Sequence, residues 1–180
     1  GRQQLLAAGQ QGGRIAAAVL NDIGPKLDPA GLARIAGYVG RGQPVANWEE
    51  AAEAARANNG AAFPGRADDP EFWRTFARRT FREIPGGRLE ADYDPMIALA
   101  FGETPTPAAD LSPLFEALAA RPVLVVRGAI SDLLSAEGLA HMRALKSDLA
   151  VIEAPNIGHA PTLEEPEVWD ALLDFLARVP

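Results

Sequence analysis

Between Arg121 and Val179 the sequence alternates twice between a short apolar run and an amphipathic segment. The runs "RPVLVVRG" and "LAVIEAP" have the length and the β-branched content of buried strands. The segments that follow them, "SAEGLAHMRAL" and "EPEVWDALLDFLARV", repeat apolar residues at helical spacing. In the last segment the residues expected to face inward are Val168, Leu172, Phe175 and Leu176. Strand, helix, strand and helix in this order predict right-handed crossovers and a parallel sheet.

A third strand is predicted near the start, where the apolar run "RIAAAVLND" closes on a turn. Residues 1–13 before it are predicted to form a short helix that ends at a glycine pair. Residues 27–95 instead contain three helix starts and no predicted strand; the starts are marked by Asp28-Pro29, Asn47 and Asp69-Pro70. We therefore predict an α/β fold with about three parallel strands flanked by helices. Residues 1–26 and 96–180 form this core, and residues 27–95 form a helical insertion.

The composition narrows the possible partners and locations. A chain of 180 residues suits one domain with a small subdomain. A net charge of −7 argues against nucleic acid and anionic membranes as partners. The absence of cysteine excludes disulfides and a cysteine nucleophile within the chain. No apolar run is long enough for a membrane span and no signal peptide is recognisable, so a cytoplasmic location is the default expectation. We expect no cofactor and no metal site, because the sequence has neither a phosphate-binding glycine loop nor metal-ligand spacing.

Two acid–base groups follow the predicted strands of the C-terminal part. Asp132 comes after "VLVVRGAIS", and His159, one of two histidines, comes after "AVIEAPNIG". Because the carboxyl ends of parallel strands meet at one edge of a sheet, these two loops can bring the side chains together. A carboxylate that accepts the imidazole N–H fixes its tautomer. The sequence therefore predicts His159 as a catalytic base and Asp132 as its orienting acid; the alternatives are a helix-capping aspartate and a structural loop histidine.

Longer segments around these two residues carry a more specific pattern. They are "PVLVVRGAISDLLSAE" and "IEAPNIGHAPTLEEPEVWDALLDFL", and the second contains G-H-x-P-x-x-E-x-P from Gly158 to Pro166. In these segments the chain resembles the C-terminal part of the α/β-hydrolase superfamily, which carries an acid after its seventh strand and a histidine after its eighth. "AAVLNDIGP" is similar to the sixth strand of that family, which makes residues 27–95 its cap. The resemblance also makes Asp22 a second candidate acid, because some members place the carboxylate there; a turn aspartate is the preferred interpretation.

The resemblance further implies where the nucleophile belongs. The family carries it at a G-x-S-x-G elbow ahead of the sixth strand. The chain has four serines, none of them in that motif: Ser112, Ser131, Ser135 and Ser147. The nucleophile is therefore expected immediately upstream of residue 1, and the chain alone is expected to be inactive or nearly so. The implied function is a hydrolase that acts on a small-molecule ester, lactone or related substrate by nucleophilic catalysis.

Two further expectations concern surfaces. Trp73 and Phe76 are candidates for substrate binding, although aromatic residues at helical spacing more often pack in a core. Without an upstream neighbour, the strand "RIAAAVLN" presents an unpaired apolar sheet edge. The alternative to a catalytic role is therefore a non-catalytic truncated or cleaved piece that self-associates through this edge, as a homo-oligomer or a strand-swapped dimer.

Overall fold

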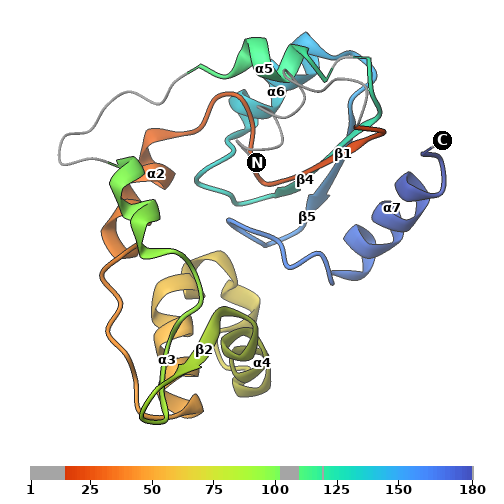
Figure 1. The fold of residues 1–180 in the computed structure, drawn as a ribbon. Helices are drawn as coiled ribbons and strands as arrows, with labels where there is room; N and C mark the ends of the chain where they lie inside the picture. The colour runs from red at the N-terminus through yellow and green to blue at the C-terminus, as the bar shows by residue number, and fades with distance from the viewer. Residues whose placement is uncertain (1–14, 102–109, 119, 180) are drawn as a thin grey trace. The chain divides into compact units, whose positions relative to one another are not determined.

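The computed structural model describes residues 15–101, 110–118 and 120–179 (Figure 1). Contacts divide the chain into two compact units, one made of Gly1–Leu32 with Pro107–Pro180 and the other of Ala33–Thr106. The predicted boundaries follow residues 26 and 95, whereas the divisions follow Leu32 and Thr106. The helix predicted over residues 1–13 lies outside the described residues. Within the described part of the chain, no helix combines the length and the apolar character needed to cross a membrane.

The first unit is built on a parallel sheet. Its described strands are β1 (Ala18–Asn21), β4 (Val123–Gly128) and β5 (Ala150–Ala154), in the spatial order β1-β4-β5. The central strand β4 pairs on both edges, and all six of its residues are buried. Burial on both faces explains why its sequence is a continuous apolar run without alternation. The predicted α/β class, with about three parallel strands flanked by helices, is confirmed.

Helices cover both faces of this sheet (Figure 1), and each face has its own hydrophobic core. The helices are α5 (Ser112–Glu116), α6 (Ala136–Leu145) and α7 (Pro166–Leu176). Successive residues of a strand point to opposite faces. Val125 therefore packs with Phe115 of α5 and Met142 of α6, whereas the next residue, Val126, packs with Val168 of α7.

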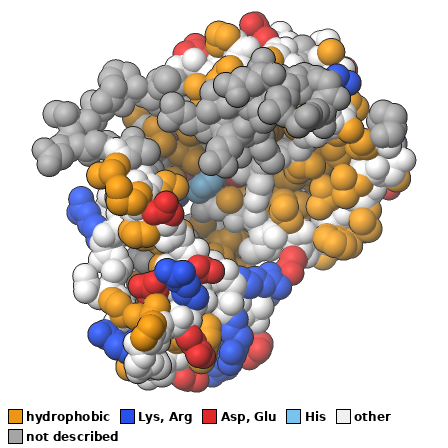
Figure 2. All heavy atoms as spheres, viewed as in Figure 1, with side chains coloured by type: hydrophobic (Ala, Val, Ile, Leu, Met, Phe, Trp, Pro, Cys, Tyr) orange, Lys and Arg blue, Asp and Glu red, His pale blue; other side chains and the backbone are white. Residues whose placement is uncertain are grey.

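The end of α7 differs from the prediction. Three of the four residues predicted to face inward pack against the sheet, but Leu176 is 52% exposed. Leu176 comes eight residues after Val168, which places it about 80° further round a helix of 3.6 residues per turn. With Trp169 and Leu173 it forms an exposed apolar stripe, in the region where Figure 2 shows hydrophobic side chains gathered.

The second unit is mainly helical, and α2 leads into it from the first. The helical segments of this part of the chain are α2 (Pro29–Tyr38), α3 (Trp48–Asn59), η1 (Gly60–Ala62), η2 (Pro64–Arg66), α4 (Pro70–Thr80) and η3 (Pro95–Phe101). The predicted start signals act as caps. The Asn47 side chain accepts a hydrogen bond from the backbone of Glu50 at 2.9 Å, and Asp69 accepts one from Phe72 at 3.0 Å.

The prediction of an insertion without strands is wrong in one place. After α4 ends at Thr80, β2 (Phe81–Ile84) and β3 (Arg88–Ala91) form an antiparallel hairpin. The chain reverses through Gly86 and Gly87, whose φ angles are 95° and 76°. Glycine adopts these left-handed conformations without steric cost, so the glycine pair makes the turn of a hairpin in a segment for which no strand was predicted.

Candidate active site

A buried carboxylate lies at the carboxyl edge of the parallel sheet. Asp22 directly follows β1, has no exposed surface and adopts a left-handed backbone conformation with a φ of 52°. Aspartate tolerates this conformation better than most residues. Its backbone N–H donates to the carbonyl of Val126 at 2.7 Å, and its Oδ1 accepts a hydrogen bond from the N–H of Gly128 at 2.9 Å. Both bonds run to β4, so the end of the central strand holds this side chain in place.

His159 lies against the other oxygen of that carboxylate. Its Nδ1 is 2.9 Å from Oδ2 of Asp22, and the hydroxyl of Ser131 donates to the same oxygen at 2.6 Å. An ionised carboxylate only accepts hydrogen bonds, so Nδ1 donates the hydrogen in this contact, and in the neutral imidazole Nε2 then keeps a lone pair. The imidazole side chain is 21% exposed, whereas the carboxylate side chain is fully buried. His159 thus has the tautomer and the partial access that a general base needs.

The meeting of Asp22 and His159 depends on a glycine at the end of β4. Because β4 lies between β1 and β5, the side chain that follows β1 must reach past the end of β4 to the loop that follows β5. A Cβ atom at Gly128 would lie 2.3 Å from the carbonyl oxygen of Gly158 and 2.5 Å from that of Ile157. Only a residue without a side chain lets the chain before His159 come this close to the central strand.

Further hydrogen bonds hold the loop that carries His159. The Asn21 side chain donates from Nδ2 to the carbonyl of Pro161 at 2.9 Å. The backbone N–H and the hydroxyl of Thr162 both donate to Oε1 of Glu165, at 2.9 Å and 3.0 Å. The loop is therefore tied to the end of β1 on one side and to the start of α7 on the other, which limits the positions open to the imidazole.

The acid preferred from the sequence is not the residue that the structure places at Nδ1 of His159. That partner is Asp22, the second candidate acid, for which a turn residue was the preferred interpretation from the sequence. Asp132 is half-buried in the turn after β4, where its backbone carbonyl lies 2.5 Å from the place a Cβ of Gly31 would take. The geometry favours Asp22 over Asp132 as the orienting acid. Locally, "NDIGP" signals only a turn, and its approach to His159 arises from the order of the strands.

The two aromatic residues predicted to bind substrate pack within the second unit. Trp73 is 2% exposed, and its indole N–H donates to the carbonyl of Arg66 at 2.8 Å. Its ring centroid lies 5.7 Å from that of Phe76 and 6.1 Å from that of Phe63. These contacts correspond to the packing alternative and account for the burial of Trp73. A role of Phe76 in substrate binding stays a prediction.

In a second cluster of an aspartate, a serine and a histidine, the hydrogen bonds run in the wrong direction for a serine nucleophile and its base. The hydroxyl of Ser112 lies 2.5 Å from Oδ1 of Asp110 and 2.8 Å from Nε2 of His141. Because the carboxylate only accepts, the hydroxyl hydrogen points to Asp110, and the hydroxyl oxygen accepts from the imidazole. The same hydrogen bond holds the pKa of Asp110 below its usual value. Ser112 therefore does not give its proton to His141, and the cluster is not a nucleophile–base pair.

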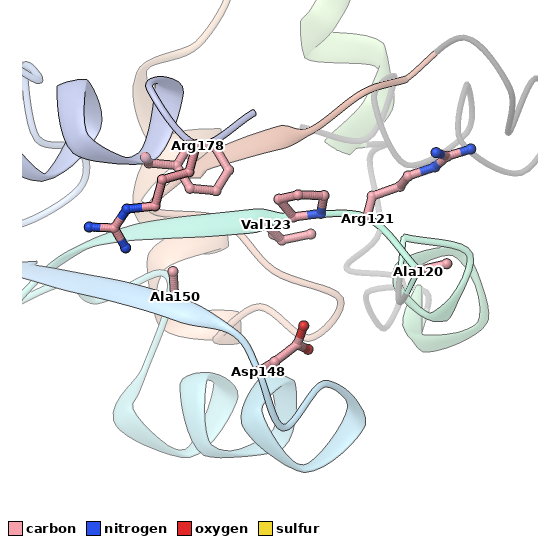
Figure 3. A pocket seen from close by; sticks show the side chains of 8 residues that line it. Ala120, Arg121, Val123, Asp148, Ala150 and Arg178 are labelled. Atoms are coloured by element: carbon pink, nitrogen blue, oxygen red, sulfur yellow. The ribbon is translucent and has the colours of Figure 1, made fainter. Parts of the chain in front are cut away.

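A hollow of about 530 Å³ lies at the other end of the strands (Figure 3). It is lined by Val123 and Ala150, the first residues of β4 and β5, and by the charged side chains of Arg121, Asp148 and Arg178. None of its lining residues is a histidine or a serine. The hollow therefore lacks the residue types of a nucleophile–base pair, and we do not assign the candidate active site to it. In the residues that the structure describes, no three His, Cys, Asp or Glu side chains are grouped as metal ligands are.

Comparisons of sequence and structure find hydrolases as similar proteins, although no family model matches the chain. The 3-hydroxybutyrate-oligomer hydrolase of Cupriavidus necator is 38% identical over 156 residues, covering 82% of this chain and 52% of that protein. An α/β hydrolase from Novosphingobium aromaticivorans DSM 12444 is 45% identical with a TM-score of 0.85, covering 98% of this chain and 61% of that one. E-2-(acetamidomethylene)succinate hydrolase, at 23% identity and a TM-score of 0.76, covers 98% and 63% and shares the fold. The chain thus spans about half the length of the curated relative it matches.

Proposed function

Since this chain belongs to the α/β-hydrolase superfamily and carries the C-terminal part of its fold, we propose that it supplies the general base and the orienting acid of a hydrolase. His159 is the base, and Asp22 orients it. One observation carries the proposal, namely the 2.9 Å contact between Nδ1 of His159 and a fully buried carboxylate. Both oxygens of that carboxylate already accept hydrogen bonds from Gly128 and Ser131, which fixes its orientation.

In the proposed reaction, Nε2 of His159 moves protons in two half-reactions. It first takes the proton of a hydroxyl nucleophile while the oxygen bonds to the substrate carbonyl carbon, and it then gives that proton to the leaving group as the old bond breaks. In the second half, Nε2 takes a proton from the attacking water and returns it to the nucleophile as the covalent intermediate is cleaved. The carboxylate of Asp22 accepts the Nδ1 hydrogen throughout and stabilises the imidazolium that forms in each half-reaction.

We place the nucleophile outside residues 1–180. Three of the four serines of the chain are tied by hydrogen bonds to other groups, namely Ser112, Ser131 and Ser135. The similar hydrolases are longer than this chain, which leaves room in the whole protein for a nucleophile ahead of β1. The 180-residue chain alone is then expected to show no turnover of a p-nitrophenyl ester. Turnover that disappears in His159→Ala would place the nucleophile within the chain after all.

We propose an ester as the substrate class. The name of the Cupriavidus necator relative specifies oligomers of 3-hydroxybutyrate, whose units are joined by ester bonds. Small esters, lactones and short hydroxy-acid oligomers all present the carbonyl carbon that a serine–histidine mechanism attacks. A 3-hydroxybutyrate dimer and p-nitrophenyl butyrate therefore serve as assay substrates for the full-length protein that carries this sequence.

The assignment of the acid is tested by comparing Asp22→Asn with Asp132→Asn in that full-length protein. The amide at residue 22 offers Nδ1 an N–H where the carboxylate offered an acceptor, so kcat is expected to fall on the order of a thousandfold or more. Asp132→Asn is expected to leave kcat near that of the unmodified protein, and His159→Ala is the positive control for loss. A larger loss for Asp132→Asn than for Asp22→Asn would return the role of orienting acid to Asp132.

A second, non-catalytic candidate rests on the edge of the sheet. Among the described strands, β1 pairs with β4 alone, so its other edge offers backbone groups to a further strand. If the 180-residue chain functions by itself, we propose that two copies associate through this edge. Light scattering at high concentration then gives the mass of a dimer, and a monomer would contradict the proposal.

A further inference from the structure

Ser131 has an unusually complete set of hydrogen bonds for a residue in a turn. Its hydroxyl donates to Oδ2 of Asp22 at 2.6 Å. The same oxygen accepts hydrogen bonds from the backbone N–H groups of Leu133 and Leu134, each at 3.1 Å. Its backbone N–H donates to the carbonyl of Gly128 at 2.9 Å, which places the turn directly against the end of β4.

These contacts determine the direction in which the hydroxyl points. A serine hydroxyl has one hydrogen and two lone pairs. The two backbone N–H groups occupy the lone pairs, so the hydrogen is left for the carboxylate of Asp22. Ser131 is therefore a fixed donor to the oxygen that also receives Nδ1–H of His159.

The carboxylate of Asp22 is consequently held at both of its oxygens. Gly128 donates to Oδ1 and Ser131 donates to Oδ2. The terminal torsion of an aspartate side chain has a broad energy minimum, so the hydrogen bond from Gly128 does not fix the plane of the carboxylate, and without Ser131 only the imidazole of His159 would hold Oδ2. With a donor at each oxygen the plane of the carboxylate is fixed, and the direction in which it presents Oδ2 to the imidazole is fixed with it.

We propose that Ser131 is a positioning residue, which acts through Asp22 to set the orientation of the imidazole of His159. This inference rests on the proposed function, in which that imidazole is the base. A catalytic group displaced by about 1 Å costs on the order of a hundredfold in rate, so a partial loss of orientation is expected to cost about tenfold. We expect the loss to fall on kcat and to leave KM unchanged, because the hydroxyl of Ser131 is already hydrogen-bonded to Asp22, Leu133 and Leu134.

The test compares Ser131→Ala with Ser135→Ala in the full-length protein. Ser135 is a matched control, since it is also half-buried in the turn after β4 and also accepts a backbone N–H at 3.1 Å, from Gly138. In Ser131→Ala we expect kcat to fall about tenfold with KM unchanged. In Ser131→Thr, which keeps the hydroxyl, kcat is expected to return to that of the unmodified protein. In Ser135→Ala, kcat is expected to stay within about twofold of that value. Equal kcat values for the two alanine variants would overturn the proposal. If Ser131→Ala does not fold, Ser131→Cys, a weaker donor of similar size, replaces it with the same expectations.

A second readout separates this inference from the proposed function. The NMR signal of the Nδ1 hydrogen of His159 reports its hydrogen bond to Asp22 directly, without substrate. We expect this signal to shift or broaden in Ser131→Ala and to stay unchanged in Ser135→Ala. An unchanged signal in both variants contradicts the positioning role, whereas a full kcat in Asp22→Asn contradicts the catalytic role of the pair itself.

Discussion

A single methyl group added at Gly128 is expected to displace the loop that carries His159. Gly128 is the buried last residue of β4, and its N–H donates to Oδ1 of Asp22. Its backbone is not in the left-handed region, so alanine is compatible with its conformation and acts by steric contact alone. The added Cβ would meet the carbonyl oxygens of Ile157 and Gly158, directly before His159.

The size of the effect follows from the distances. The Cβ of Gly128→Ala would lie 2.3 Å from the oxygen of Gly158. A carbon–oxygen contact normally needs about 3.3 Å, so the loop must move by about 1 Å. The atoms in the way belong to the backbone and cannot rotate aside, and such overpacking costs about 1–3 kcal/mol of unfolding free energy. A displacement of about 1 Å at the base is also expected to lower kcat on the order of a hundredfold.

Urea unfolding and ester hydrolysis on the full-length protein measure the two effects. The matched control is Gly37→Ala, since a Cβ at Gly37 in α2 would meet no atom within 4 Å. Replacing an unhindered helical glycine by alanine is expected to raise the unfolding free energy by about 0.5–1 kcal/mol and to leave kcat unchanged. If Gly128→Ala matched the unmodified protein in both stability and kcat, the close approach of β4 to the His159 loop would not be the constraint inferred here.

Two further predictions concern stability. Leu20 is fully buried whereas Leu176 is 52% exposed, so in urea unfolding Leu20→Ala is expected to cost about 2–5 kcal/mol and Leu176→Ala less than about 0.5 kcal/mol; equal costs would contradict the assignment of the core. The hydrogen bond from the backbone N–H of Phe72 lowers the pKa of Asp69 below its ordinary value of 3.8. The ionised cap therefore stabilises the folded state above pH 3.8, and this stabilisation is lost as the pH falls through the lowered pKa. The stability advantage of the unmodified protein over Asp69→Asn, measured by thermal unfolding, is therefore expected to shrink below pH 3.8, and a difference independent of pH would refute this interpretation.

The local spacing of apolar and capping residues in the sequence was sufficient to predict most helices and strands. The caps at Asn47 and Asp69 each accept the backbone hydrogen bond that their sequence signals predicted. The continuous apolar run of β4 indicated a strand covered on both faces, and all six of its residues are buried. The prediction that residues 27–95 contain no strand was wrong, because Gly86 and Gly87 make the turn of the β2–β3 hairpin.

The sequence by itself therefore determined the α/β class, the alternation of strands and helices from β4 to α7 and the position of His159 in the loop after β5, because each depends on residues within a few positions of one another. The partner of His159 was decided by the tertiary structure alone. Asp22 and His159 are 137 residues apart, and they meet across the end of β4, which lies between their strands, because β4 ends in a residue without a side chain. Two aspartates stood at the ends of neighbouring strands, and only the pairing of strands distinguishes the one whose carboxylate reaches the imidazole.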